Sequence, residues 1–110
     1  MLIDEKIQEY YKIIDNYIKK LKITDIDKIY GGVSYRELKT REKEHKDEDS
    51  RFQNLNIYEI LNVKNKQIIK KCEDYLIEKL NKKFKSKILN KVQGGGGITT
   101  AYIYYLYVMY

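Results

Sequence analysis

Glu73 is a carboxylate that lies on or beside the apolar stripe of a predicted helix, Lys66 to about Lys83. The stripe consists of aliphatic residues at spacings that share one helix face: Ile69, Leu76, Ile77 and Leu80. A carboxylate inside a core is costly unless a cation pairs with it. The sequence therefore predicts that Glu73 lies at the rim of the core or binds a cation, which leaves a basic side chain and a metal ion both open.

Arg41 and His45 form a second pair of residues that could do chemistry. They are four positions apart in the highly charged segment YRELKTREKEHKDED, where a helix is expected from about Arg36 to Lys46. Residues at this spacing lie on one helix face. A solvated helix held by ion pairs would explain the segment, but His45 is the only histidine of the chain. Both interpretations stay open.

Two further segments of possible functional importance contain glycine or asparagine. The sequence YGGVS at Tyr30–Ser34 predicts a short strand that opens into a turn. Glycine in such a strand permits a positive φ or the close approach of another group. The segment from Asn90 to Gly97 ends in four glycines, which predicts a flexible joint or backbone that lies against a ligand.

The composition sets limits on the class of protein. With 110 residues, 43% hydrophobic and 35% charged, the chain predicts one globular domain, residues 1–110. The net charge of +6 favours a polyanionic partner. One cysteine, Cys72, excludes an internal disulfide, and with one histidine it argues against a structural zinc site. We expect an intracellular, soluble protein with no membrane partner, because the apolar run 101–110 is too short to span a bilayer.

The remaining elements must position these residues. Residues 1–22 contain a predicted amphipathic helix, Asp4 to Lys22, and Asn54 to Asn62 alternates as a strand does. Asn65 is placed to cap the helix that carries Glu73. The β-branched and aromatic segment 98–110 is apolar on both alternating faces, so we expect a strand inside the sheet. The expected fold is α/β of the α+β kind, a small mixed sheet of about three strands flanked by three helices.

These motifs occur in a familiar order. The YGGVS strand, the helix with Arg41 and His45, a helix glutamate in the context EDYLI, and Asn90 before a glycine run together resemble the GIY-YIG nuclease superfamily over residues 28–97. Three features depart from the family pattern: the gap from Tyr30 to Arg41 is about one residue longer than usual, Gly31 replaces the aliphatic residue of YIG, and no GIY strand precedes it. We expect the C-terminal strand to replace that strand, as in a circular permutation, with Tyr104 in place of the GIY tyrosine.

The resemblance implies a metal-dependent DNA endonuclease that hydrolyses phosphodiester bonds. Glu73 would be the protein ligand of Mg²⁺ (or Mn²⁺), and Arg41 would hold the scissile phosphate. Tyr30 would position the phosphate or a bound water, Tyr104 (or Tyr30) would be the general base, and His45 would relay a proton.

The substrate-binding residues implied by the resemblance lie near the glycine run. Asn90 would bond the phosphate or fix the neighbouring backbone. A basic turn would contact DNA phosphates through Lys83, Lys85, Lys87 and Lys91. A viral or mobile-element source fits the family, so the protein would work in the cytoplasm, nucleus or virus factory of a host cell.

Two alternatives remain. The first is a catalytically inactive GIY-YIG-like protein that binds DNA or serves a structural role. The second is an unrelated α/β interaction module in which the tyrosine-rich C-terminal strand forms an oligomer contact, such as that of a homodimer. A structural role also stays open for each residue: Glu73 would pair with a Lys or Arg without a metal, Tyr30 and Tyr104 would be core tyrosines, and the lysines would be solvated.

Overall fold

The fold is mixed α+β, as the sequence predicted. The computed structural model describes residues 3–90 and 99–110, and within them three helices accompany a three-stranded antiparallel sheet. Each expected helix and strand is present. Their bounds are α1 Ile3–Lys20, β1 Tyr30–Ser34, α2 Leu38–Glu48, β2 Ile57–Val63, α3 Lys66–Phe84 and β3 Tyr104–Met109.

The C-terminal strand β3 is the central strand of the sheet, whose order is β1-β3-β2. Tyr107 of β3 lies opposite Gly32 of β1 on one side and Glu59 of β2 on the other. The prediction of an interior strand is therefore confirmed. Because both edges of β3 are already paired within the chain, neither edge is open to strand pairing with a second copy of the chain.

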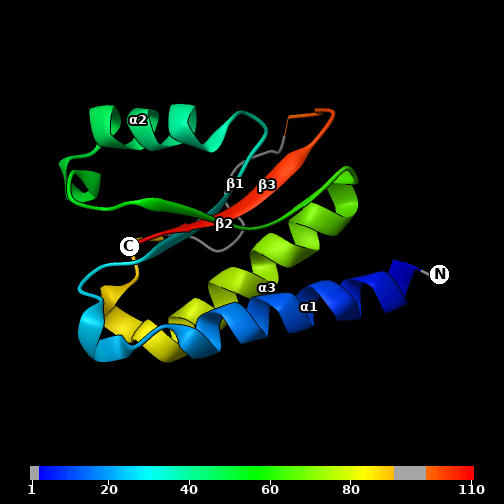
Figure 1. The fold of residues 1–110 in the computed structure, drawn as a ribbon, viewed down its shortest axis with the longest axis horizontal. Coiled ribbons are helices and arrows are strands. Elements are labelled where there is room, and N and C mark those ends of the chain that lie inside the picture. The colour runs from blue at the N-terminus through cyan, green and yellow to red at the C-terminus, as the bar shows by residue number, and fades with distance from the viewer. Residues whose placement is uncertain (1–2, 91–98) are drawn as a thin grey trace.

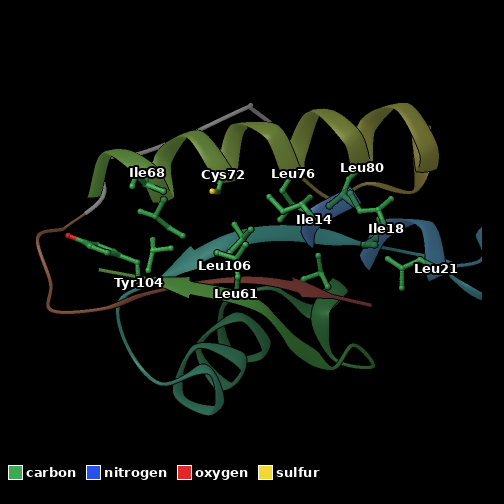
Figure 2. Close-up of a cluster of buried hydrophobic side chains, with 14 of the residues drawn as sticks. Ile14, Ile18, Leu21, Leu61, Ile68, Cys72, Leu76, Leu80, Tyr104 and Leu106 are labelled. Carbon is green, nitrogen blue, oxygen red and sulfur yellow. The ribbon is translucent and has the colours of Figure 1, made fainter. Parts of the chain in front are cut away.

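Helices cover both faces of the sheet (Figure 1). α1 and α3 pack together against one face, and α2 lies over the other. The larger core fills the space between the sheet and the α1–α3 pair, and Figure 2 shows Ile14, Leu76 and Leu106 among its members. A smaller core lies under α2 and consists of Phe52, Leu55, Tyr107 and Met109.

The position of α3 follows from features of the sequence. The Asn65 side chain accepts a hydrogen bond from the Ile68 backbone N–H at 3.0 Å, so the predicted N-cap is confirmed. Gly31 lets the helix approach β1, because a Cβ there would lie 2.9 Å from Leu76 Cδ2 and 3.0 Å from Leu80 Cδ1. The close approach predicted for the glycine pair is therefore made by α3 at Gly31.

The segment before the glycine run covers the outer edge of β1. Ile88 forms a parallel bridge with Ile29, and the Leu89 N–H donates to the Ile29 carbonyl at 2.8 Å. Lys91 and the glycine run Gly94–Gly97 lie outside the described residues. Within the residues that the structure describes, no helix combines the length and the hydrophobicity that crossing a membrane would need.

Candidate active site at the β1 edge

Tyr107 is the centre of a polar cluster on the α2 face of the sheet. Its side chain crosses the backbone of its pairing partner on β1: a Cβ at Gly32 would lie 2.7 Å from the Tyr107 hydroxyl oxygen and 3.0 Å from Cε1 of Tyr30. The missing side chain of Gly32 therefore makes room for both tyrosine rings. This is the second close approach that the glycine pair permits.

His45 of α2 contacts Tyr107 directly. Its Nε2 lies 2.7 Å from the Tyr107 hydroxyl, and the imidazole is 5% exposed. The ring stacks on Phe52 at a centroid distance of 4.6 Å and meets Tyr30 edge-on at 4.9 Å. Burial, and then the charge of Arg41, lower the pKa of His45 to about 4. His45 is therefore neutral at pH 7.

Arg41 lies one helical turn before His45, as the spacing predicted. Burial acts to lower the pKa of Arg41, but the charge and hydrogen-bonding interactions with Tyr107 and the charge of Tyr30 outweigh it and raise that pKa. Its guanidinium also lies 3.4 Å from the Glu44 carboxylate. The side chain is 24% exposed, so part of the guanidinium remains accessible to an anion.

Tyr30 of β1 completes the aromatic part of the cluster. Its ring lies 6.2 Å from that of Tyr107 and 5.2 Å from that of Phe52. Burial raises the pKa of Tyr30, Arg41 acts to lower it, and Glu73 acts to raise it. Burial also raises the pKa of Tyr107. Both phenols are therefore protonated at neutral pH.

Glu73 belongs to α3, on the other face of the sheet from Tyr107, and its negative charge acts to raise the pKa of both Tyr30 and Tyr107. The Glu73 side chain is 11% exposed, and its Oε1 lies 3.4 Å from Lys70 Nζ. Burial raises the pKa of Glu73, and Lys70 partly offsets the rise. Glu73 therefore lies at the rim of the core and also has a basic partner, one turn earlier on its own helix.

The donor set at Glu73 fits magnesium better than zinc. Among the described residues, no three His, Cys, Asp or Glu side chains lie close enough to form a metal cage. Magnesium binds oxygen ligands, keeps several waters, and commonly uses only one or two carboxylates. A largely buried carboxylate with a raised pKa is compatible with that coordination.

Tyr104 does not take part in this cluster, contrary to the expectation. It packs in the larger core under α1 and α3, and its hydroxyl accepts a hydrogen bond from the Ala101 N–H at 2.9 Å. Tyr107 lies three residues later and packs on the opposite face with Met109. Side chains alternate along a strand, so the two tyrosines cannot share a face. The tyrosine that β3 contributes to the cluster is Tyr107.

Tyr107 and Phe52 were not singled out as site residues from the sequence pattern. Both faces of β3 are apolar, so its alternation does not distinguish one face from the other. The one usable signal was Gly32, whose missing side chain requires a large neighbour to fill the space. Only the strand register shows that this neighbour is Tyr107.

Asn90 binds backbone. Its Oδ1 accepts from the Gly31 N–H at 3.0 Å, and its Nδ2 donates to the Gly31 carbonyl at 2.8 Å. The side chain thus satisfies both backbone polar groups of Gly31 at the outer edge of β1. Of the two roles expected for Asn90, the structure places it in the one that fixes the neighbouring backbone.

The basic turn is partly used within the fold. Lys83 Nζ donates to the Ile18 carbonyl at 2.6 Å, and Lys87 Nζ donates to the Ile23 carbonyl at 2.7 Å. Both lysines therefore tie the end of α3 to the end of α1. Lys85 is exposed, and Lys91 lies outside the described residues.

Comparison of the chain with known protein families, with characterised proteins and with solved structures found no match. A functional proposal for this chain therefore depends on its own residues and their geometry.

Proposed function

We propose that the chain is a GIY-YIG-like, metal-dependent endonuclease that hydrolyses phosphodiester bonds of DNA. One observation supports this most: Tyr30, Arg41, His45 and Tyr107 cluster beside β1 on the α2 face of the sheet, and the charge of Glu73, from α3, acts on both tyrosines. Four of them were singled out from the sequence for this activity. The central position of β3 also supports the permuted strand order, with Tyr107 in the role first expected of Tyr104.

The cluster offers a path for the proton of an attacking water. We assign the proton of neutral His45 to Nδ1, so that Nε2 accepts from the Tyr107 hydroxyl. As water attacks phosphorus, its proton passes to the Tyr107 oxygen while the Tyr107 proton passes to His45. The bond from phosphorus to the leaving alcohol oxygen breaks, and solvent protonates that oxygen.

Arg41 would bind the phosphate that reacts. Its guanidinium lies beside both phenols, so a phosphate bound to it would be next to the proton acceptor. The negative phosphate would also offset the charge of Arg41, which now lowers the pKa of His45. Substrate binding would therefore make His45 a better base.

Glu73 would be the protein ligand of Mg²⁺ or Mn²⁺. A divalent cation there would neutralise the negative charge that develops on the phosphate oxygens. Glu73 would turn from Lys70 to the metal, and Lys70 would keep its ion pair with Asp74. The site needs no further carboxylate, because water and phosphate oxygens complete magnesium coordination.

A catalytically silent DNA-binding protein is the second candidate, and one contact favours it. Lys70 Nζ lies 3.4 Å from Glu73 Oε1, so a basic side chain already partly neutralises the carboxylate. If Lys70 remains there when DNA binds, the site has no place for a metal. The same cluster would then bind a phosphate through Arg41 without cleaving the strand.

Nicking of supercoiled plasmid, with and without Mg²⁺ or Mn²⁺, tests the proposal. The variants are Glu73→Ala and Arg41→Ala, and the matched control is Glu78→Ala, which removes an exposed carboxylate from the same helix. We expect nicking that requires the metal, falls about 100-fold or more in both variants, and persists in the control.

Two results of the plasmid assay would contradict the proposal. A folded wild-type chain that binds plasmid but leaves it intact with either metal would overturn the nuclease proposal and support the silent candidate. Nicking that survives in Glu73→Ala would remove Glu73 from the site and point to a contaminating nuclease.

A further inference from the structure

Two exposed tyrosines stand beside cations at one end of the sheet. Tyr102 is 78% exposed, and Lys64 Nζ lies 4.9 Å from its ring centre and 3.2 Å from its hydroxyl oxygen. Tyr35 is 41% exposed, and the Arg36 guanidinium lies 4.9 Å from its ring centre. Each pair presents an aromatic ring and a cation at the surface, and Arg36 also forms an ion pair with Glu44 at 2.7 Å.

The strand register brings the two pairs to the same place. Ser34 of β1 and Asn62 of β2 both lie opposite Tyr105 of β3. The residues just after β1, just after β2 and just before β3 therefore meet at one end of the sheet, as Figure 1 shows. Tyr35, Lys64 and Tyr102 belong to these three segments.

A third exposed tyrosine, Tyr58, differs from these two because its ring packs on another aromatic ring of the protein. Tyr58 is 38% exposed, but its ring stacks on that of Tyr110 at a centroid distance of 4.6 Å. Among the ring contacts of the described residues, neither Tyr35 nor Tyr102 has an aromatic partner. A cation lies over one face of each ring, and no aromatic side chain of the described residues competes with a flat, apolar ligand for the other face.

We propose that this end of the sheet binds unpaired nucleobases, which stack on Tyr35 and Tyr102 while Lys64 and Arg36 contact the flanking phosphates. Base–aromatic stacking combined with nearby positive charge is how proteins bind single strands without sequence preference. A duplex hides the faces of its bases, so this surface favours nucleic acid with an unpaired segment.

The surface lies close to the candidate active site, and in this respect the inference rests on the proposed function. Tyr35 is three residues beyond Gly32, which is roughly 10 Å along an extended strand. A strand bound at Tyr35 and Tyr102 could therefore continue towards Arg41 and Tyr107. The substrate class would be DNA with unpaired bases beside the scissile phosphate.

Fluorescence anisotropy in EDTA tests the binding surface without cleavage. The probes are a labelled single-stranded oligothymidine and a labelled hairpin duplex of similar length. The variants are Tyr35→Ala and Tyr102→Ala, with Tyr35→Phe and Tyr102→Phe to retain the rings and Tyr58→Ala as the matched control. We expect the single strand to bind more tightly, to lose about tenfold in affinity in each alanine variant, and to keep its affinity in the Phe variants and the control.

Three results would overturn the inference: no binding of the single strand, equal or tighter binding of the duplex, or alanine variants that bind like Tyr58→Ala. The outcome is separate from that of the plasmid assay. If Tyr35→Ala and Tyr102→Ala lose affinity for the single strand but the wild type does not nick plasmid, only the nuclease proposal is rejected. Metal-dependent nicking with unchanged single-strand affinity would reject only this surface.

Discussion

The hydroxyl of Tyr107 lies 2.7 Å from Nε2 of His45, so the central strand and the helix above it share a buried hydrogen bond. Arg41 interacts with the same hydroxyl. One phenol therefore lies between a neutral imidazole and a permanent cation. This arrangement distinguishes Tyr107 from the other tyrosines of the strand and leads to the first prediction.

Tyr107→Phe should reduce metal-dependent cleavage by about 100-fold, because the phenol that takes the proton of water is lost. Tyr104→Phe is a matched control, since it removes another buried hydroxyl from the same strand on the opposite face. Initial rates of plasmid nicking measure both. Equal rates for wild type and Tyr107→Phe would exclude Tyr107 from the proton path.

His45 should titrate far below an ordinary histidine, at a pKa of about 4. It is the only histidine, so one pair of imidazole proton signals in an NMR titration reports it directly. The folded pKa lies below the unfolded value of about 6.5, so the stabilisation is present above pH 6.5 and is lost as pH falls towards 4.

The lowering of the His45 pKa from about 6.5 to about 4 corresponds to a loss of about 3 kcal/mol of unfolding free energy between pH 6.5 and 4. Denaturant unfolding of wild type and His45→Gln at several pH values separates this loss from that due to carboxylates. The wild type should lose more stability than the variant over this interval. Parallel curves, or an imidazole pKa near 6.5, would contradict the buried geometry.

Comparison of Gly32→Ala with Gly31→Ala should distinguish an effect on cleavage from an effect on core packing. A Cβ at Gly32 would displace Tyr107 and Tyr30, whereas a Cβ at Gly31 would press on Leu76 and Leu80 of the core. Both changes should lower the free energy of unfolding by about 1–3 kcal/mol. Only Gly32→Ala should also reduce cleavage by the folded protein. Similar rates for the two variants would argue against a role of the Tyr107 position.

Asn90→Ala should destabilise the fold by about 1–3 kcal/mol, because the N–H and carbonyl of Gly31 lose their side-chain partners. Asn90→Asp should also destabilise it, since a carboxylate cannot donate to the Gly31 carbonyl. Chemical denaturation measures both. If stability is unchanged while DNA affinity falls, Asn90 contacts substrate instead of backbone.

Glu73→Gln should stabilise the metal-free protein at pH 7, because a buried negative charge is removed. The pKa of Glu73 is raised, so its contribution to stability is present below pH 4.5 and is lost as pH rises through the folded pKa. The gain in the variant should therefore shrink as pH falls below 4.5. Added Mg²⁺ should stabilise wild type but not Glu73→Gln in thermal unfolding, and equal shifts would exclude Glu73 as ligand.

The sequence predicted correctly those features that depend on residues within a single helix or strand. The period of α1 and α3, the Asn65 cap and the pairing of Arg41 with His45 along α2 depend on residues a few positions apart. The two apolar faces of β3 also correctly predicted a central strand.

The same two apolar faces hid which tyrosine enters the site. Tyr107 is distinguished only by its register with Gly32, and Asn90 only by its hydrogen bonds to Gly31, 59 residues away in the chain. Such contacts depend on how distant segments align, which short-range spacing does not determine.

The central position of β3 has a consequence for synthesis of the protein. β1 and β2 pair with β3 and not with each other, and both precede it in the chain. Neither strand finds its partner until the ribosome has released β3. The helices α1 and α3, which contact each other, can associate earlier. Until β3 emerges, the nascent chain exposes two unpaired strands. If synthesis of β3 is slow, the nascent chain would depend on chaperones to prevent aggregation.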